Sequence, residues 1–262
     1  MRILIPWSGG LESTYVLYNA LETTDHDVVA VHYPEAYNTR FEYAEQLQRR
    51  AVDSLTPLMP RAFRLETGTV QTQDALGGAF DRKATHPIRP GYKIYRNSYY
   101  LRCRYATHGF HADAYDVDEV WLGTTAWNKR GEQEFKREIF KGYTDATLLE
   151  PLINKGWARL RTRRALPDNL ASLIMLCPNE NPKVKSCGGT TCRTCVVERF
   201  YRDVCAGLSD DRVSDLEELI LQEAREYNYR SLQDPREYNP DRLHDSMSPI
   251  NDSHWRAELA SL

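Results

Sequence analysis

The chain has 262 residues and a mass of 30.3 kDa, which suits one large α/β domain or a main domain with a small appendage and leaves little room for two large domains. Apolar residues make up 41% and charged residues 27%, as is ordinary for a soluble globular protein. The formal net charge of −3 provides no global attraction to nucleic acid or to an anionic membrane. No segment approaches the roughly 18 apolar residues of a membrane span, and Pro6 interrupts the first apolar stretch too early for a signal peptide. We therefore expect a soluble, cytoplasmic protein with no membrane partner.

The first part of the chain is predicted to alternate strands and helices. Apolar runs and helical spacing place these elements, in order, at residues 2–7 (strand), about 13–21 (helix), 28–33 (strand), 40–55 (helix) and near 62–65 (strand). Because apolar strands alternate with helices, the pattern predicts a parallel sheet covered on both faces, that is, an α/β fold.

A long loop and a fourth strand follow. Gly and Pro residues between Asp74 and Arg96 predict a loop or lid over a ligand. A helix over residues 98–114 then leads to a strand over residues 119–123. Since ligands of open α/β sheets bind beyond the carboxyl ends of the strands, we expect the turn after this strand to face the same pocket as the first loop.

The second half of the chain is predicted to be smaller and helical. Leucine and isoleucine at helical spacing predict a helix over residues 213–227, and the last thirty residues are rich in Asp, Asn, Ser and Pro. We expect three parts: a nucleotide-binding α/β domain at 1–164, a helical subdomain with clustered cysteines at 165–232, and a tail at 233–262.

The motif that carries most chemistry is Ser8-Gly9-Gly10-Leu11-Glu12-Ser13, between the first strand and the first helix. A turn here leaves backbone N–H groups free at a helix N-terminus, where the helix dipole adds positive charge. The two glycines let phosphate oxygens approach the backbone, the two serine hydroxyls can donate hydrogen bonds, and Glu12 can hold nucleotide-bound Mg²⁺. Ser-Gly-Gly also occurs as a plain tight turn, but its place between a strand and a helix favours nucleotide binding.

Extended to Thr14, this motif resembles the Ser-Gly-Gly-x-Asp-Ser-Thr signature of the pyrophosphatase-loop (PP-loop) ATP pyrophosphatases. These enzymes adenylate a substrate and release pyrophosphate. The resemblance implies ATP and Mg²⁺ at residues 8–13, with Ser8, Glu12 and Ser13 taking part in catalysis. No Gly-Lys-Ser/Thr follows the turn, so the loop is not of the kinase type.

Four cysteines are clustered near the C-terminal end, with the spacing C-x9-C-x4-C-x2-C: Cys177, Cys187, Cys192 and Cys195. In a cytosolic protein, clustered cysteines more often bind metal than form disulfides. Four thiolates at this spacing can close a tetrahedral Zn²⁺ site, which would be structural because no coordination position stays open. A redox Cys-x-x-Cys pair and unrelated buried cysteines are the alternatives.

The loop and the cysteine cluster together resemble the 7-cyano-7-deazaguanine synthase family of the queuosine pathway. Arg96-Asn97, the strand and turn at 120–128, and Pro151-Leu152 also match that family's pattern, so the resemblance covers about residues 1–205. It implies a homodimer, nucleotide contact at Gly123 and substrate contact at Asn128. Arg96 and Asn97 follow the predicted loop, where the guanidinium can bind phosphate and the amide can contact a ring edge of the substrate; a helix start with a solvated arginine is the alternative.

Two further residues are candidates from their positions alone. Lys129 follows the fourth strand and can neutralise phosphate or pyrophosphate; an ordinary charged loop is the alternative. His32 ends the second strand, where it can lie near adenine; a hydrogen-bonded histidine at the sheet end is the alternative.

The resemblance implies a ligase reaction. A carboxylate like that of 7-carboxy-7-deazaguanine attacks the α-phosphorus of ATP, ammonia then displaces AMP to give an amide, and a second activation gives the nitrile. Ammonia comes free or from another protein, and nucleic acid is not expected as a direct substrate. Glu12 stands where the signature has Asp, and residues 129–135 replace the family's substrate-framing segment. Two alternatives therefore stay open: a nucleotide-binding protein with altered catalysis, and a tRNA-modifying enzyme of the thiolation type.

A basic run, Arg159, Arg161, Arg163 and Arg164, lies after Pro151-Leu152. It contains no interleaved aromatic residues, and the chain as a whole is acidic. We interpret it as a solvated face, with contact to RNA as the alternative.

Overall fold

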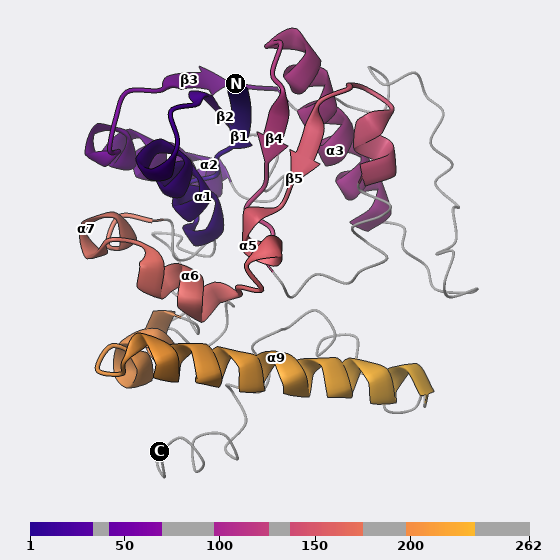
Figure 1. The fold of residues 1–262 in the computed structure, drawn as a ribbon. Helices are drawn as coiled ribbons and strands as arrows, with labels where there is room; N and C mark the ends of the chain where they lie inside the picture. The colour runs from indigo at the N-terminus through magenta and orange to yellow at the C-terminus, as the bar shows by residue number, and fades with distance from the viewer. Residues whose placement is uncertain (34–41, 70–96, 126–136, 175–197, 234–262) are drawn as a thin grey trace.

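A five-stranded parallel sheet is the centre of the molecule. The computed structural model describes residues 1–33, 42–69, 97–125, 137–174 and 198–233 (Figure 1). The strand order is β3-β2-β1-β4-β5, and every neighbouring pair is parallel. The strands are β1 (Arg2–Pro6), β2 (Asp27–His32), β3 (Arg64–Thr67), β4 (Glu119–Trp121) and β5 (Thr147–Leu149).

Apolar residues of β1 pack on both faces of this sheet. Ile3, Leu4 and Ile5 are fully buried, because β1 lies in the middle of the sheet, with Leu4 opposite Val29 of β2 and Val120 of β4. Ile3 and Ile5 belong to one hydrophobic cluster and Leu4 to another. The alternation of a strand thus builds two cores from one continuous apolar run.

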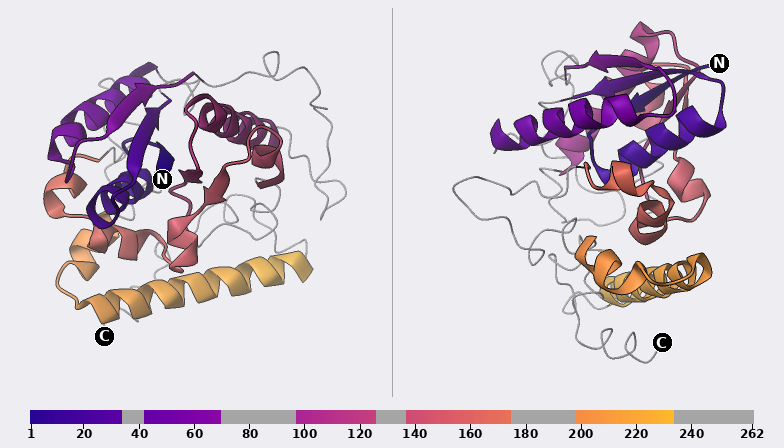
Figure 2. Two further views of the ribbon diagram at one scale, coloured as in Figure 1. Left: turned by 45° about the horizontal axis from the view of Figure 1, so that its top comes forward. Right: turned by 90° about the vertical axis from the view of Figure 1, so that its left-hand side faces the viewer.

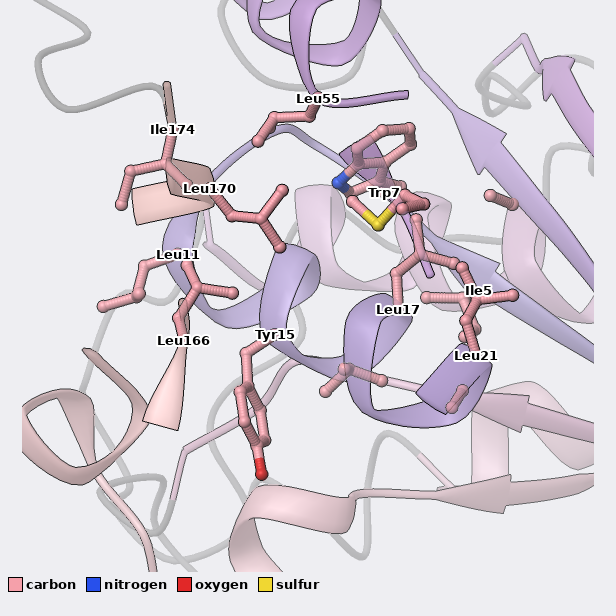
Figure 3. Packing of buried hydrophobic residues seen from close by; sticks show 14 of the residues in the cluster. Ile5, Trp7, Leu11, Tyr15, Leu17, Leu21, Leu55, Leu166, Leu170 and Ile174 are labelled. Atoms are coloured by element: carbon pink, nitrogen blue, oxygen red, sulfur yellow. The ribbon is translucent and has the colours of Figure 1, made fainter. Parts of the chain in front are cut away.

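Helices cover both faces, as predicted. Helices α1, α2 and α7 contribute buried residues to the hydrophobic cluster that contains Ile3 and Ile5, shown in Figure 3, and α6 packs against it. Helix α3 packs on the opposite face of the sheet. The helices are α1 (Leu11–Thr23), α2 (Glu42–Leu55), α3 (Asn97–Ala114), α5 (Pro151–Asn154), α6 (Arg159–Ala165), α7 (Asp168–Ala171) and α9 (Asp210–Gln233), with short helical turns η1 (Thr56–Leu58) and η2 (Tyr201–Cys205).

A third core joins α6 to the C-terminal helices. Leu160 of α6 packs with Cys205 of η2 and with Val213, Leu216 and Ile220 of α9. Burial raises the pKa of the Cys205 thiol to about 12, so this cysteine is an inert core residue. In Figures 1 and 2, α9 lies beside α6 and away from the sheet, so α6 connects the C-terminal helices to the sheet domain.

The predicted order of elements is confirmed where the structure describes it, with corrections at the boundaries. The third strand begins at Arg64 rather than near residue 62, because Arg61 donates to the carbonyls of Leu21, Thr24 and His26 and fixes the preceding loop. The three-residue strand β5 was not predicted, since it is too short to show a period. Helix α9 extends beyond the predicted range at both ends.

The predicted loop or lid at residues 74–96 lies outside the described residues. Across the part of the chain that the structure describes, no helix combines the length and apolar character needed to cross a bilayer.

Candidate nucleotide site

The turn between β1 and α1 is held by its own serine hydroxyls. The Oγ atoms of Ser8 and Ser13 lie 3.0 Å apart, and the Ser8 backbone N–H donates to Ser13 Oγ at 3.2 Å. The Gly10 N–H donates to Ser8 Oγ at 3.3 Å. Behind the turn, the buried Trp7 donates from Nε1 to Thr14 Oγ1 at 3.1 Å. The turn is therefore organised without a ligand, which lowers the entropic cost of binding one.

Glycine is required in this turn for conformation and for space. Gly9 has a φ of +73°, a left-handed value that disfavours residues with a Cβ. A Cβ at Gly9 would also lie 3.0 Å from the Cβ of Ala51 in α2. Gly10 is the N-cap of α1 and provides no side-chain cap. The positive end of α1 thus lies at the carboxyl edge of the sheet with no side chain capping it.

The turn after β4 packs directly on the start of α1. A Cβ at Gly123 would lie 2.7 Å from the backbone N of Ser13 and 2.8 Å from the carbonyl carbon of Glu12, so only glycine permits this approach. The strand order reverses at β1, with β2 on one side and β4 on the other. Open α/β sheets bind ligands at such a point. The two turns therefore lie together, and that they face one ligand pocket stays a prediction.

Glu12 forms an ion pair that the sequence did not predict. Its Oε1 lies 2.5 Å from Nε of Arg159, the first residue of α6, and the two side chains are 18% and 16% exposed. Glu12 lies in the first turn of α1, where the helix dipole favours a carboxylate. Its oxygens are ligands of the type that Mg²⁺ prefers, so the residue fits the predicted metal role. Arg159 is the cation that balances it.

The start of α6 is fixed by a buried carboxylate from α9. Glu217 is 1% exposed and accepts hydrogen bonds from the backbone N–H groups of Ala158, Leu160 and Arg161, at 2.8, 2.6 and 3.1 Å. It also accepts from Nε of Arg161 at 2.7 Å. The N-cap residue Ala158 offers no side-chain cap, so Glu217 caps α6 from a distant part of the chain.

The basic run is not a solvated face, which corrects that interpretation, and contact of the run with RNA stays a prediction. Each of its four guanidinium groups pairs with a carboxylate of this chain: Arg159 with Glu12, Arg161 with Glu217, Arg163 with Glu198, and Arg164 with Asp210. Hydrogen bonds to Tyr201 and Asp210 raise the pKa of Arg164 above its usual value. The role of the run could not be predicted from sequence, because the carboxylates that pair with it lie up to 56 residues further along the chain or, for Glu12, near its beginning.

His32, at the end of β2, contacts the residue that precedes the loop. It is 3% exposed, and its Nδ1 lies 3.0 Å from the backbone oxygen of Trp7, one residue before Ser8. This contact adds to the backbone pairing in which the Trp7 N–H donates to Val31 O at 2.8 Å. A histidine tied to the sheet end was the alternative interpretation, and the described contact is of that kind. Contact with adenine stays a prediction.

Glu150 is a polar residue of this edge that sequence reasoning missed. It follows β5, is 2% exposed, and neither of its carboxylate oxygens has a hydrogen-bond partner among the described residues. Arg137 Nη2 lies 3.7 Å from one of these oxygens. Its position directly after a strand and before Pro151 was the available signal, because side chains at strand ends face the ligand edge.

Several predicted site residues lie outside the described residues. These are Arg96, Asn128, Lys129 and the four cysteines Cys177, Cys187, Cys192 and Cys195; Asn97 begins α3, but its side chain is not described. Among the described residues, no group of three or more His, Cys, Asp and Glu side chains is arranged to hold a metal ion. The zinc site and the substrate contacts stay predictions.

Comparisons with known proteins assign no family. No protein-family model matches the chain, and no curated protein matches it in sequence. Among solved structures, the U34-tRNA thiolase NcsA from Methanococcus maripaludis, with its [4Fe-4S] cluster, matches with 12% identity and a TM-score of 0.42, over 85% of this chain and 73% of that one. A likeness of this size transfers no activity.

Proposed function

We propose that this chain is an ATP-dependent enzyme that adenylates an acceptor and releases pyrophosphate. The observation that carries the proposal is the Ser8–Ser13 turn, organised by its own hydroxyls at the point where the strand order reverses. The start of α1 offers backbone N–H groups and dipole charge to an anion, and Gly123 lets the turn after β4 approach it.

In the proposed reaction, an acceptor oxygen forms a bond to the α-phosphorus of ATP while the bond from that phosphorus to the β-phosphate oxygen breaks. The electron pair of the broken bond leaves with pyrophosphate. The described residues would contribute by holding the triphosphate in line and stabilising the departing charge, which needs no protein nucleophile. Glu12 would hold Mg²⁺, whose bound charge offsets that of the phosphates.

The acceptor we propose first is a carboxylate of the 7-carboxy-7-deazaguanine type. Its support is the sequence pattern that joins the loop to Arg96-Asn97, Pro151-Leu152 and the cysteine cluster. Ammonia would then attack the acyl adenylate, expelling AMP and losing a proton to give the amide. A second ATP would adenylate the amide oxygen with release of pyrophosphate, and loss of AMP and of the two N–H protons would give the nitrile.

A uridine of tRNA is the second candidate acceptor. Its support is the set of four clustered cysteines, since thiolates ligate iron–sulfur clusters as well as zinc. RNA that bound on the basic run of α6 would have to replace carboxylates of this chain as the partners of its arginines.

One experiment separates the two acceptors. The protein is incubated with Mg²⁺ and ATP, either with ammonium and 7-carboxy-7-deazaguanine or, without oxygen, with tRNA and sulfide, and products are identified by mass spectrometry. We expect the acid to raise AMP formation at least 10-fold and to yield amide or nitrile. Thiolated uridine would instead assign the second acceptor, and no effect of either would reject both. Ser13→Ala should abolish turnover, whereas Ser172→Ala, at an exposed serine of the same chain, should not.

A further inference from the structure

We infer that Arg159 is the cation of the ATP site that binds the β- and γ-phosphates and the departing pyrophosphate, and that Glu217 is the positioning residue that aims it there. This inference rests on the proposed function and adds to it a residue from outside the loop. It follows from the charge of the loop, from the direction of the four arginines, and from the contacts at the start of α6.

The loop lacks a positive side chain of its own. Residues 8–14 contain no Lys or Arg, and Glu12 adds a negative charge where the triphosphate would bind. Backbone N–H groups and a helix dipole supply only partial charges. An arginine from another element would add a full positive charge to this site, and its guanidinium fork matches phosphate oxygens in geometry as well as charge.

Arg159 differs from the other three arginines in where its partner lies. Arg161, Arg163 and Arg164 pair with carboxylates of the C-terminal helices or of the adjoining Asp168. Arg159 alone of these four pairs with a residue of the nucleotide loop. Three arginines thus fasten α6 to the C-terminal helices, and the remaining one faces the site.

Among the residues that the structure describes, Lys155 is a second cation beside α1, and it is held elsewhere. Its Nζ donates to Tyr15 Oη at 3.1 Å and lies 4.7 Å from the ring centre of Trp157. Tyr15 follows the loop directly in α1, and the Lys155 Nζ also donates to Oδ1 of Asn19, one turn further along that helix, at 3.3 Å. Lys155 is therefore engaged away from the residues that would contact phosphate.

The Glu12–Arg159 pair would exchange partners when Mg·ATP binds. Without nucleotide, each side chain neutralises the other at 2.5 Å. Mg·ATP brings a cation for the Glu12 carboxylate and an anion for the Arg159 guanidinium, so neither charge is left unbalanced at a largely buried position. The pair balances the charge of Glu12 and places Arg159 beside the residues that would hold the phosphates.

Glu217 explains why Arg159 is in place. It accepts three backbone N–H bonds at the first turn of α6, including those of Ala158 and Leu160 on either side of Arg159. The backbone that carries Arg159 is therefore fixed by α9. The C-terminal helices are thereby linked to the nucleotide site through one short helix.

The test compares ATP with AMP, because only ATP carries the phosphates that Arg159 would bind. Affinities of the full-length protein are measured by calorimetry for Mg·ATP, pyrophosphate and AMP. For Arg159→Ala we expect the ATP and pyrophosphate affinities to fall about 10- to 100-fold, as for loss of a charged hydrogen bond, while the AMP affinity stays within about twofold. Arg159→Lys should recover part of the loss. Arg202→Gln, at an arginine of η2 whose side chain is 70% exposed, should leave all three affinities unchanged.

The outcomes separate this inference from the proposed function. If ATP and AMP affinity fall together in Arg159→Ala, Arg159 has a structural role only and the inference is wrong. It is equally wrong if no affinity changes. A wild-type protein that binds no ATP would instead reject the proposed function, whatever the variants do. Retained AMP binding reports that each variant is folded.

Discussion

At the scale of single residues, Gly123 determines how closely the β4 turn approaches the nucleotide loop. A Cβ would meet the backbone of Ser13 and Glu12 at less than 3 Å, and backbone cannot move aside as a flexible side chain can. We predict that Gly123→Ala lowers ATP affinity at least 10-fold and destabilises the fold by about 1–3 kcal/mol. Calorimetry and urea denaturation measure the two effects.

The matched control is Gly207→Ala. No atom lies within 4 Å of a Cβ at Gly207, and this glycine does not have a positive φ. It should bind ATP as the wild type does. If Gly123→Ala also bound ATP normally, the two turns would not form one site.

The residues of the loop were identifiable from sequence, but their partners were not. A strand, two glycines and a helix start predict the Ser8–Ser13 turn because its conformation depends on neighbours in the chain. The pairing of Glu12 with Arg159 joins residues 147 positions apart, which no local pattern encodes. For the same reason Glu150 was passed over, since its burial depends on how β5 meets the sheet.

At the scale of elements, α6 depends on Glu217 for its position. Replacing this buried carboxylate by an amide removes one of the two oxygens that accept from three backbone N–H groups and from Arg161. We predict that Glu217→Gln lowers the free energy of unfolding by about 2–4 kcal/mol. It should also weaken Mg·ATP binding more than AMP binding, because the backbone that carries Arg159 is released. Urea denaturation and calorimetry test both parts.

The neighbouring Glu218 is the control. Its side chain is 70% exposed and lies 3.6 Å from the same arginine, Arg161, so Glu218→Gln should change the free energy of unfolding by less than about 0.5 kcal/mol. Equal effects of the two substitutions would contradict the assignment of Glu217 as the residue that fixes α6.

Sequence patterns predicted the longer elements and missed the interactions between them. Helix α1 and strands β1 and β2 were predicted because their apolar residues recur with a clear period. Strand β5 was not predicted, because three residues are too few to show a period. The arginines of α6 were predicted to form a solvated face. They form ion pairs instead, because the C-terminal helices supply carboxylates that the sequence pattern does not reveal.

At the scale of the whole molecule, a parallel α/β sheet brings the turns after β1 and β4 together, and α6 joins them to the C-terminal helices. The order of strands follows from this packing and was not predicted, although the parallel sheet covered on both faces was. In the proposed reaction, the sheet domain provides the loop and the helix dipole. Helix α6, whose backbone is fixed by Glu217 of α9, provides the guanidinium of Arg159.

The central claim is that ATP is cleaved between its α- and β-phosphates at this junction. Phosphorus NMR of the complete reaction, with Mg²⁺, ATP and acceptor, resolves AMP and pyrophosphate from ADP and phosphate. We predict AMP and pyrophosphate in equal amounts, formed by the wild type and lost in Ser13→Ala. ADP and inorganic phosphate as the products, or AMP formed equally well by Ser13→Ala, would contradict the account.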